Sequence, residues 1–163
     1  MAKYPGLSLH PYALGEDTRS VEMRLRADGY GSSTLPIEHP DFAERLTVQQ
    51  YNLDQYVTDK NLPLPDVLKM DVQVGEGAIL RGASRCLAHA GIVFAETWVE
   101  RDYGPETPLV TEIHDQLTRF GFQFAEIGAR AYTDDHRLFG FDAYFIKQDL
   151  LSQLAPKMPK HRW

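Results

Sequence analysis

The sequence has little that would set it apart from an ordinary soluble domain. Of its 163 residues only Cys86 is a cysteine, so no disulfide can form within the chain. No apolar run reaches the roughly 18 residues that a membrane-spanning helix needs. The N-terminal residues lack the apolar stretch of a secretory signal peptide. We therefore expect a cytoplasmic protein that does not enter a membrane.

Positive charge is also scarce. There are 17 lysine and arginine residues against 23 acidic residues, which gives a formal net charge of −6. Because such a chain repels a phosphate backbone, nucleic acid is not expected as its main partner. The composition, 43% hydrophobic and 25% charged, is that of a globular domain, and the length suffices for one domain with a proper core.

The first third of the chain predicts short strands and a long loop. Residues 7–14 and 20–27 alternate apolar and polar side chains and are interpreted as a β-hairpin. Residues 28–47 contain several glycines, prolines and serines, which are typical of a loop. A short strand over 48–53 is expected next, followed by a short helix that Asp54 caps.

From residue 67 onward, predicted strands and helices alternate. This order is typical of an α/β layer fold with a largely parallel sheet. The continuous apolar run at 92–95 indicates a strand that is buried on both faces. The expected elements are a strand over 67–72, a helix from Gly75 to about Ala90, a strand over 92–95, a helix that starts with Thr107 and Pro108 and ends at Gly121, and two strands over 122–128 and 142–147, joined by a polar loop at 133–138.

Acidic and polar side chains follow the predicted strands 67–72 and 92–95. In open α/β sheets, ligands bind beyond the C-terminal ends of the strands, so these side chains are expected along one rim. A carboxylate at that rim can accept a proton from a substrate hydroxyl, although a solvated acid or a helix cap is the alternative interpretation. The rim residues are Asp71, Gln73, Glu76, Glu96 and Glu100.

Three other patterns have weaker functional interpretations. Gly75 and Gly77, between a strand and a helix, resemble part of a dinucleotide-binding fingerprint, but Leu80 occupies the third glycine position. The ligand-type side chains at 133–136 are adjacent in sequence, so a polar turn is favoured over a metal site. Cys86 lies in an apolar helix and is interpreted as a core thiol rather than a nucleophile.

Residues 66–83 read Asp-Val-Leu-Lys-Met-Asp-Val-Gln-Val-Gly-Glu-Gly-Ala-Ile-Leu-Arg-Gly-Ala. This string resembles the central motif of the FkbM family of S-adenosylmethionine-dependent methyltransferases, and the resemblance extends over roughly residues 7–148. The matching residues are Leu68, Lys69, Asp71, Val72, Gln73, Glu76, Leu80, Gly82 and Ala83.

The resemblance implies a Rossmann-like methyltransferase sheet in the order 3-2-1-4-5-7-6, with helices on both faces and an antiparallel C-terminal strand pair. Two departures from the family are visible. Val74 stands where the family has glycine, and since only glycine enters positive φ at little cost, the turn there is expected to differ. The family's first two strands, which carry the glycine-rich donor motif and a ribose-binding acid, have no counterpart.

We therefore expect a partial methyltransferase domain over residues 1–150, truncated at its N-terminus, and a basic, frayed tail over 151–163. Without its first two strands, the 67–72 strand has a bare edge. Such an edge invites pairing with another chain, either in a homo-oligomer or with a different partner.

The resemblance also implies a function, methyl transfer from S-adenosylmethionine to a hydroxyl of a small molecule, sugar or natural product. Asp71, Glu76 and Glu96 are the predicted catalytic residues. Asp71, Gln73 and Ser33 are the predicted cofactor-binding residues, and no metal site is expected. The missing glycine-rich motif leaves open the alternative of a non-catalytic fragment, or of a half-domain that a partner chain completes.

Overall fold

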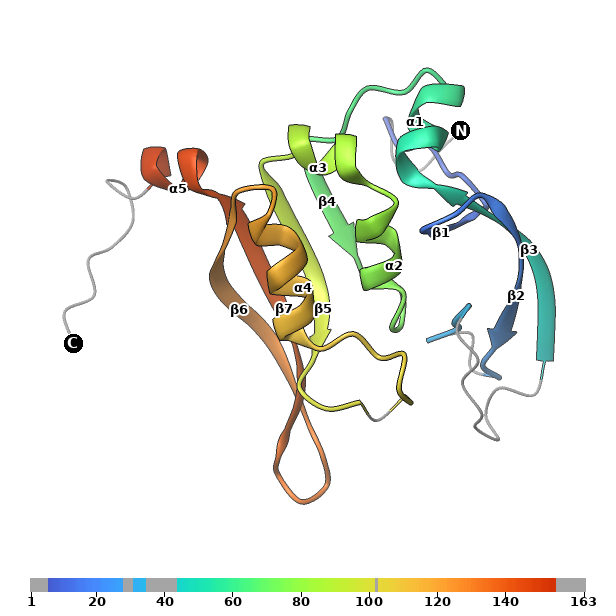
Figure 1. Ribbon diagram of the computed structural model, residues 1–163. Helices are drawn as coiled ribbons and strands as arrows, with labels where there is room; N and C mark the ends of the chain where they lie inside the picture. The colour runs from blue at the N-terminus through green and yellow to red at the C-terminus, as the bar shows by residue number, and fades with distance from the viewer. Residues whose placement is uncertain (1–5, 28–30, 35–43, 102, 155–163) are drawn as a thin grey trace.

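The computed structural model describes residues 6–27, 31–34, 44–101 and 103–154. Within these ranges, strands and helices form two sheets with most helices gathered beside the larger one (Figure 1). The elements are β1 (Ala13–Gly15), β2 (Arg19–Leu25), β3 (Glu44–Asn52), α1 (Leu53–Asp59), β4 (Val67–Met70), α2 (Glu76–Arg81), α3 (Ser84–His89), β5 (Ile92–Trp98), α4 (Val110–Thr118), β6 (Phe122–Tyr132), β7 (Leu138–Lys147) and α5 (Gln148–Leu154).

The smaller sheet has the order β1-β3-β2, with β3 parallel to β1 and antiparallel to β2. The predicted hairpin between the first two strands is therefore wrong, because both pair with β3 rather than with each other. Cross-strand apolar pairs explain the choice of partner, since Val21 lies opposite Val48 and Met23 opposite Leu46. β3 also begins at Glu44, inside the segment expected to be a loop.

The larger sheet has the order β4-β5-β7-β6. β4 and β5 are parallel, whereas β7 runs antiparallel to both β5 and β6. The expected antiparallel C-terminal strand pair is confirmed. The expectation of a largely parallel sheet is wrong for this part of the chain, because β6 and β7 are joined by a short turn, and only antiparallel neighbours can be connected that way.

The single helix predicted over 75–90 is broken into α2 and α3. Gly82, at the break, lies against the end of β1, and a Cβ atom added to it would stand 2.4 Å from the carbonyl oxygen of Gly15. A glycine is required for this close approach. The helical pattern is therefore interrupted where the end of α2 packs against β1 of the smaller sheet.

Asp54 is a helix cap, but for a different helix than predicted. Its carboxylate accepts hydrogen bonds from the backbone N–H groups of Arg85 at 2.6 Å and Cys86 at 2.8 Å, in the first turn of α3. The N-cap of α1 is Asn52, whose side chain accepts from the N–H of Gln55 at 3.1 Å. Sequence spacing alone cannot reveal a cap donated by another helix.

The start of α4 also differs from the prediction. Leu109 rather than Thr107 is its N-cap, and the carboxylate of Glu112 accepts from the Leu109 N–H at 2.8 Å. Leu109 forms a parallel β-bridge with Trp98, so the extended segment before α4 continues two residues beyond Thr107. Thr107 is instead fully buried, and its carbonyl accepts a hydrogen bond from Arg101.

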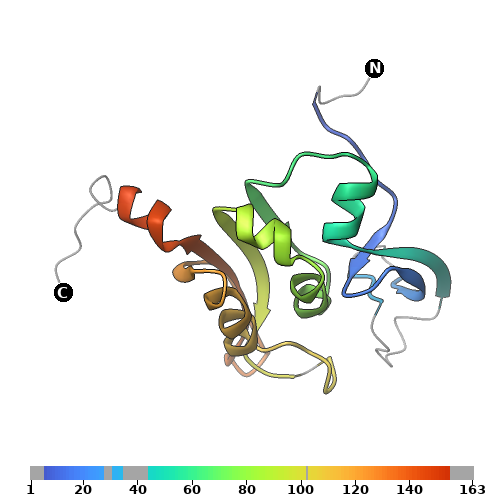
Figure 2. The same ribbon diagram turned by 45° about the horizontal axis from the view of Figure 1, so that its top comes forward.

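Helices α2, α3 and α4 lie on the same face of the larger sheet (Figure 2). Val93 and Ala95 of β5 point to this face and are wholly buried with Ala143 and Phe145 of β7. The three helices thus form one layer, and they do not supply the expected second layer on the opposite side.

We call the opposite side of the sheet the open face. Phe94 is only partly buried there, Tyr144 is 36% exposed and Val67 is 55% exposed. The prediction that β5 is buried on both faces is therefore wrong for the described chain. Strand register places the following side chains on the open face: Val67, Lys69, Ile92, Phe94, Glu96, Asp142, Tyr144 and Ile146.

The predicted domain boundary at residue 150 falls inside α5, and residues 155–163 of the predicted tail lie outside the described residues. No helix in the described ranges has both the length and the apolar character needed to cross a membrane.

Candidate functional site

The loop between β4 and α2 carries several of the predicted site residues and has an unusual backbone. Gln73 has φ 50° and Val74 has φ 78°, both in the left-handed region. Val74, which stands where the family has glycine, thus occupies a conformation that glycine adopts at little cost. For a β-branched residue that conformation is strained. Its side chain is 3% exposed, so packing holds the strained residue in place.

Two hydrogen bonds connect this loop to other predicted site residues. The Ser33 hydroxyl donates to the Gln73 carbonyl oxygen at 2.8 Å. The Gln73 side-chain amide donates to a carboxylate oxygen of Glu96 at 3.1 Å. The structure therefore brings together Ser33, the β4–α2 loop and the C-terminal half of β5, which are far apart in sequence.

Glu76 begins α2 and is the most deeply buried acid of the site. Its residue surface is 0% exposed. One carboxylate oxygen, Oε1, accepts from the Val72 N–H at 3.3 Å, while Oε2 is buried without a hydrogen-bond partner among the described residues. Burial raises the pKa of Glu76 to about 7, and the charges of Glu96 and Asp71 add to this effect.

Glu96 shares this electrostatic environment. Burial raises its pKa to about 7, and the carboxylates of Asp71 and Asp142 contribute further, against a smaller opposing effect of Lys69. Asp142 lies directly opposite Glu96 in the β5–β7 register. Sequence reasoning did not select Asp142, because only the strand pairing shows that it faces Glu96.

Asp71 is the exposed member of the group. Its carboxylate forms an ion pair with the Lys69 ammonium at 2.7 Å, and both side chains are more than half exposed. The ammonium of Lys69 also lies 5.1 Å from the centre of the Phe94 ring on the open face. Lys69 thus holds Asp71 at the rim of the sheet, next to the apolar surface of the open face.

Two of these acids can change their protonation state near neutral pH. Two carboxyl groups with pKa values of about 7 stand beside a third, exposed carboxylate. A general acid or base is most effective when its pKa lies near the operating pH, and a cation placed here would favour the charged forms. Within the described ranges, no group of three or more His, Cys, Asp or Glu side chains is arranged to hold a metal ion.

A small cavity of about 130 Å³ lies beside Glu96 at the same end of the sheet. Its walls include Glu96, Asp142, Trp98 and Phe141. All four of these residues come from β5 and β7, so the cavity gives a small ligand access to Glu96.

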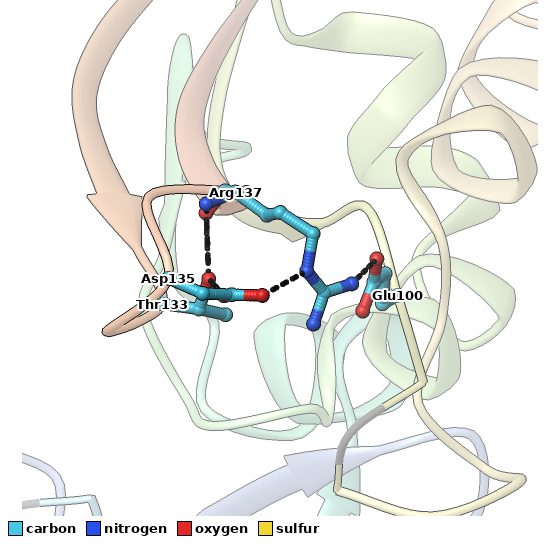
Figure 3. Close-up of polar contacts among 4 residues, drawn as sticks. All are labelled: Glu100, Thr133, Asp135 and Arg137. Carbon is cyan, nitrogen blue, oxygen red and sulfur yellow. Dashed lines mark hydrogen bonds and ion pairs between the residues drawn. The ribbon is translucent and has the colours of Figure 1, made fainter.

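The polar segment at 133–136 forms a turn, as predicted, and Glu100 of the predicted rim is bound to it (Figure 3). Arg137 lies between two carboxylates, with donor–acceptor distances of 2.9 Å to Asp135 and 2.7 Å to Glu100. The Arg137 N–H also donates to the Thr133 hydroxyl at 3.0 Å. These contacts tie the β6–β7 turn to the loop after β5, so Glu100 serves structure rather than the acidic group.

Cys86 is fully buried, which confirms its interpretation as a core thiol. Burial raises the pKa of the thiol to about 12, and the adjacent Asp54 carboxylate raises it further. The thiolate needed for nucleophilic chemistry is therefore almost absent at neutral pH.

Comparison with known proteins agrees with the motif at residues 66–83. A family model described as the methyltransferase FkbM domain matches residues 3–129, which include the smaller sheet, the β4–α2 loop and the whole of β5. Searches of curated proteins and of solved structures each find no match. Because the family model covers most of the sequence and includes every acid of the rim from Asp71 to Glu100, the chain belongs to the FkbM methyltransferase family.

Proposed function

We propose that the protein is an S-adenosylmethionine-dependent methyltransferase that acts on a hydroxyl of a small molecule, sugar or natural product. The observation that carries this proposal is the acidic group at the C-terminal ends of β4 and β5, in a chain of a methyltransferase family. Asp71, Glu76 and Glu96 are its proposed catalytic residues. Ligands of open α/β sheets bind at this end of the strands.

The order of the larger sheet supports a Rossmann-like interpretation. The strand order is β4-β5-β7-β6, and β7 runs antiparallel to both of its neighbours. Strands 4-5-7-6 of the family's sheet have the same arrangement. The open edge of β4 then corresponds to the position of strand 1. On this interpretation the described chain forms one half of the sheet and one of its two helical layers.

The acidic group fits the cationic part of the methyl donor. The donor's sulfonium carries a positive charge. A positive charge next to Glu96 and Asp71 would offset both the burial and the carboxylate repulsion that raise the pKa of Glu96. Asp71, Gln73 and Ser33 would hold the donor, which when bound supplies an activated methyl group. The cavity of about 130 Å³ beside Glu96, which these three residues do not line, is smaller than the roughly 300–1,000 Å³ of typical cofactor sites, so it can take only part of the donor.

The chain's own residues have distinct proposed tasks. The exposed carboxylate of Asp71 would accept the proton that leaves the acceptor hydroxyl. Glu96, held by the Gln73 amide at 3.1 Å, would line the site beside Asp71. Glu76 would fix the β4–α2 loop through its hydrogen bond with the Val72 N–H at 3.3 Å. Much of the catalysis would then consist of alignment.

The open face favours a second candidate, a half-domain that a partner chain completes. Phe94 and Tyr144 stack at 4.7 Å between ring centres without a helix of the α2–α4 layer over them. β4 has β5 on one edge and no described strand on the other. The partner we propose would add a strand to that edge and an apolar layer over the open face. Sedimentation velocity tests this, because a stable monomer that also binds the donor would rule it out.

The donor proposal is tested by thermal melting with S-adenosylmethionine and S-adenosylhomocysteine. Ligand at a hundred times its dissociation constant adds about 2.7 kcal/mol, which for a chain of this size raises Tm by roughly 5–10 °C. Asp71→Asn should abolish methyl transfer and leave the ligand-free Tm within about 2 °C of the parent, while the exposed Asp59→Asn should behave like the parent. A sharp transition with no ligand shift would refute donor binding, and full turnover of the Asp71 variant would remove Asp71 from the mechanism.

A further inference from the structure

A second cavity, of about 490 Å³, lies between α2 and α4 and is closed on one side by the loop that joins β5 to α4. This volume lies within the roughly 300–1,000 Å³ of small-molecule sites. Val74 contributes to its wall and directly follows Gln73, whose amide binds Glu96 at 3.1 Å. The cavity therefore borders the β4–α2 loop and is much larger than the cavity beside Glu96.

Two hydrogen-bond donors approach a single point inside this cavity, above Gly77. A Cβ atom built on Gly77 would stand 3.5 Å from Nη1 of Arg81 and 3.6 Å from Nε2 of Gln116. Because Gly77 has no side chain, no side-chain atom stands at this Cβ position, and a ligand group lying farther from the Gly77 Cα can approach both donors. Pro108 bounds the Gly77 Cβ position on a third side, with its own Cβ 3.3 Å away.

Both donors have capacity to spare. Arg81 forms an ion pair with Glu16 through Nε, at 2.6 Å, which leaves its Nη groups for another acceptor. No hydrogen bond of the Gln116 side chain occurs within the described ranges. Arginine presents several donors in a fixed fork that matches a carboxylate or a phosphate.

The other charged groups of the cavity are two arginines and three acids, and one arginine is paired with one of the acids. Glu112 is engaged by Arg101 at 2.5 Å and by the Leu109 N–H, and these contacts lower its pKa. Arg119, at the C-terminal end of α4, also lines the cavity and forms no ion pair with a described residue. Two further acids, Glu106 and Asp115, complete the charged lining.

We propose that this cavity binds the methyl acceptor, and that it does so through an oxyanion group of the acceptor, a carboxylate or a phosphate, held by Arg81 and Gln116 above Gly77. The inference rests on the proposed methyltransferase function and specifies the acceptor as an anionic small molecule. Binding of the oxyanion in this cavity would leave the remainder of the acceptor to extend past Val74 toward Asp71 and Glu96.

The test compares three probes that share one sugar ring. Glucose 6-phosphate and glucuronate each carry an oxyanion, whereas glucose does not, and binding to the full chain is measured by calorimetry without any methyl donor. Since hydrogen bonds to charged groups are the strong ones, we expect at least one of the two anions to bind roughly ten- to a hundredfold more tightly than glucose. Preference for the phosphate or the carboxylate then identifies the kind of oxyanion.

Two variants locate the binding site. Gly77→Ala places a methyl group at the point where Arg81 and Gln116 converge, without removing any charge, and Arg81→Gln removes one donor group. Each should weaken anion binding about tenfold or more, whereas Arg45→Gln, which removes an arginine paired with Glu22 on β3, should have no effect. Circular dichroism and the Tm of each variant establish that it folds.

The outcomes separate this inference from the proposed function. Equal affinity for glucose and both anions, no detectable binding of any probe, or anion binding that Gly77→Ala and Arg81→Gln leave unchanged would each overturn the inference. Donor binding is measured separately, as the Tm shift with S-adenosylhomocysteine. Anion binding that depends on Arg81 without such a shift would support the cavity while contradicting the methyltransferase proposal.

Discussion

The buried carboxyl of Glu76 should make the protein less stable as pH rises. In the unfolded chain this group titrates near 4.5, whereas in the folded chain its pKa is about 7. Between these values the folded state holds a proton that the unfolded state has released, so the free energy of unfolding falls with rising pH. The loss begins near pH 4.5 and is complete above pH 7. At about 1.4 kcal/mol per pKa unit, it amounts to about 3 kcal/mol for this one group.

Glu76→Gln removes the charge but keeps an oxygen that can accept from the Val72 N–H. We expect the variant to match the parent within about 1 kcal/mol at pH 5 and to exceed it by about 3 kcal/mol at pH 8.5. For a chain of this size the higher stability corresponds to a Tm difference of roughly 6–12 °C. Urea unfolding at a series of pH values measures the effect directly.

The control is Glu44→Gln, at the exposed start of β3, which should follow the parent at every pH. Glu96 has the same raised pKa, so the variant should keep part of the pH dependence. A parent whose stability is constant from pH 5 to 8.5, or a Glu76 variant that declines as steeply as the parent, would refute the reasoning.

Three further predictions concern other residues. Cys86 should resist iodoacetamide in the folded protein at pH 8 and react in urea, because the thiol is buried with a pKa of about 12. Labelling of the folded protein as fast as that of the unfolded protein would contradict this. Val74→Gly should be more stable than Val74→Ala by about 0.5–1 kcal/mol in urea unfolding, since φ 78° strains alanine; the usual order, alanine above glycine, would disprove the strain. Gly82→Ala should lower Tm by several degrees, because its Cβ would stand 2.4 Å from the Gly15 carbonyl oxygen; a Tm equal to or above the parent's would show that no close approach exists.

Patterns within a segment predicted its structure well, whereas contacts between segments were not predictable. The strands β4 to β7 and the acids that follow β4 and β5 could be located from periodicity and from the family motif. Gly82 could not be recognised as a break in a helix, because the cause is the carbonyl of Gly15, far away in sequence. Asp142 joins the acidic group only because β7 pairs with β5.

The open face was unpredictable for the same physical reason. The apolar run at 92–95 correctly indicates a strand, but its predicted burial on both faces is wrong, because a sequence does not state what covers each face. The structure buries Val93 and leaves Phe94 partly exposed. The positive φ of Val74 was also not predictable from the sequence. Valine disfavours this conformation, and the surrounding structure imposes it.

The contacts of Asp54 affect how the protein opens locally and exchanges its amide hydrogens. Its carboxylate accepts hydrogen bonds from the first turn of α3, and its backbone N–H donates to the Gly82 carbonyl at 3.1 Å. A residue of α1, the helix that follows the smaller sheet, is therefore bonded to the helical layer of the larger sheet. Separation of α1 from α3 breaks these bonds. Amide hydrogens of β3, α1 and α3 should therefore exchange with solvent together, as one cooperative unit rather than as two independently opening halves.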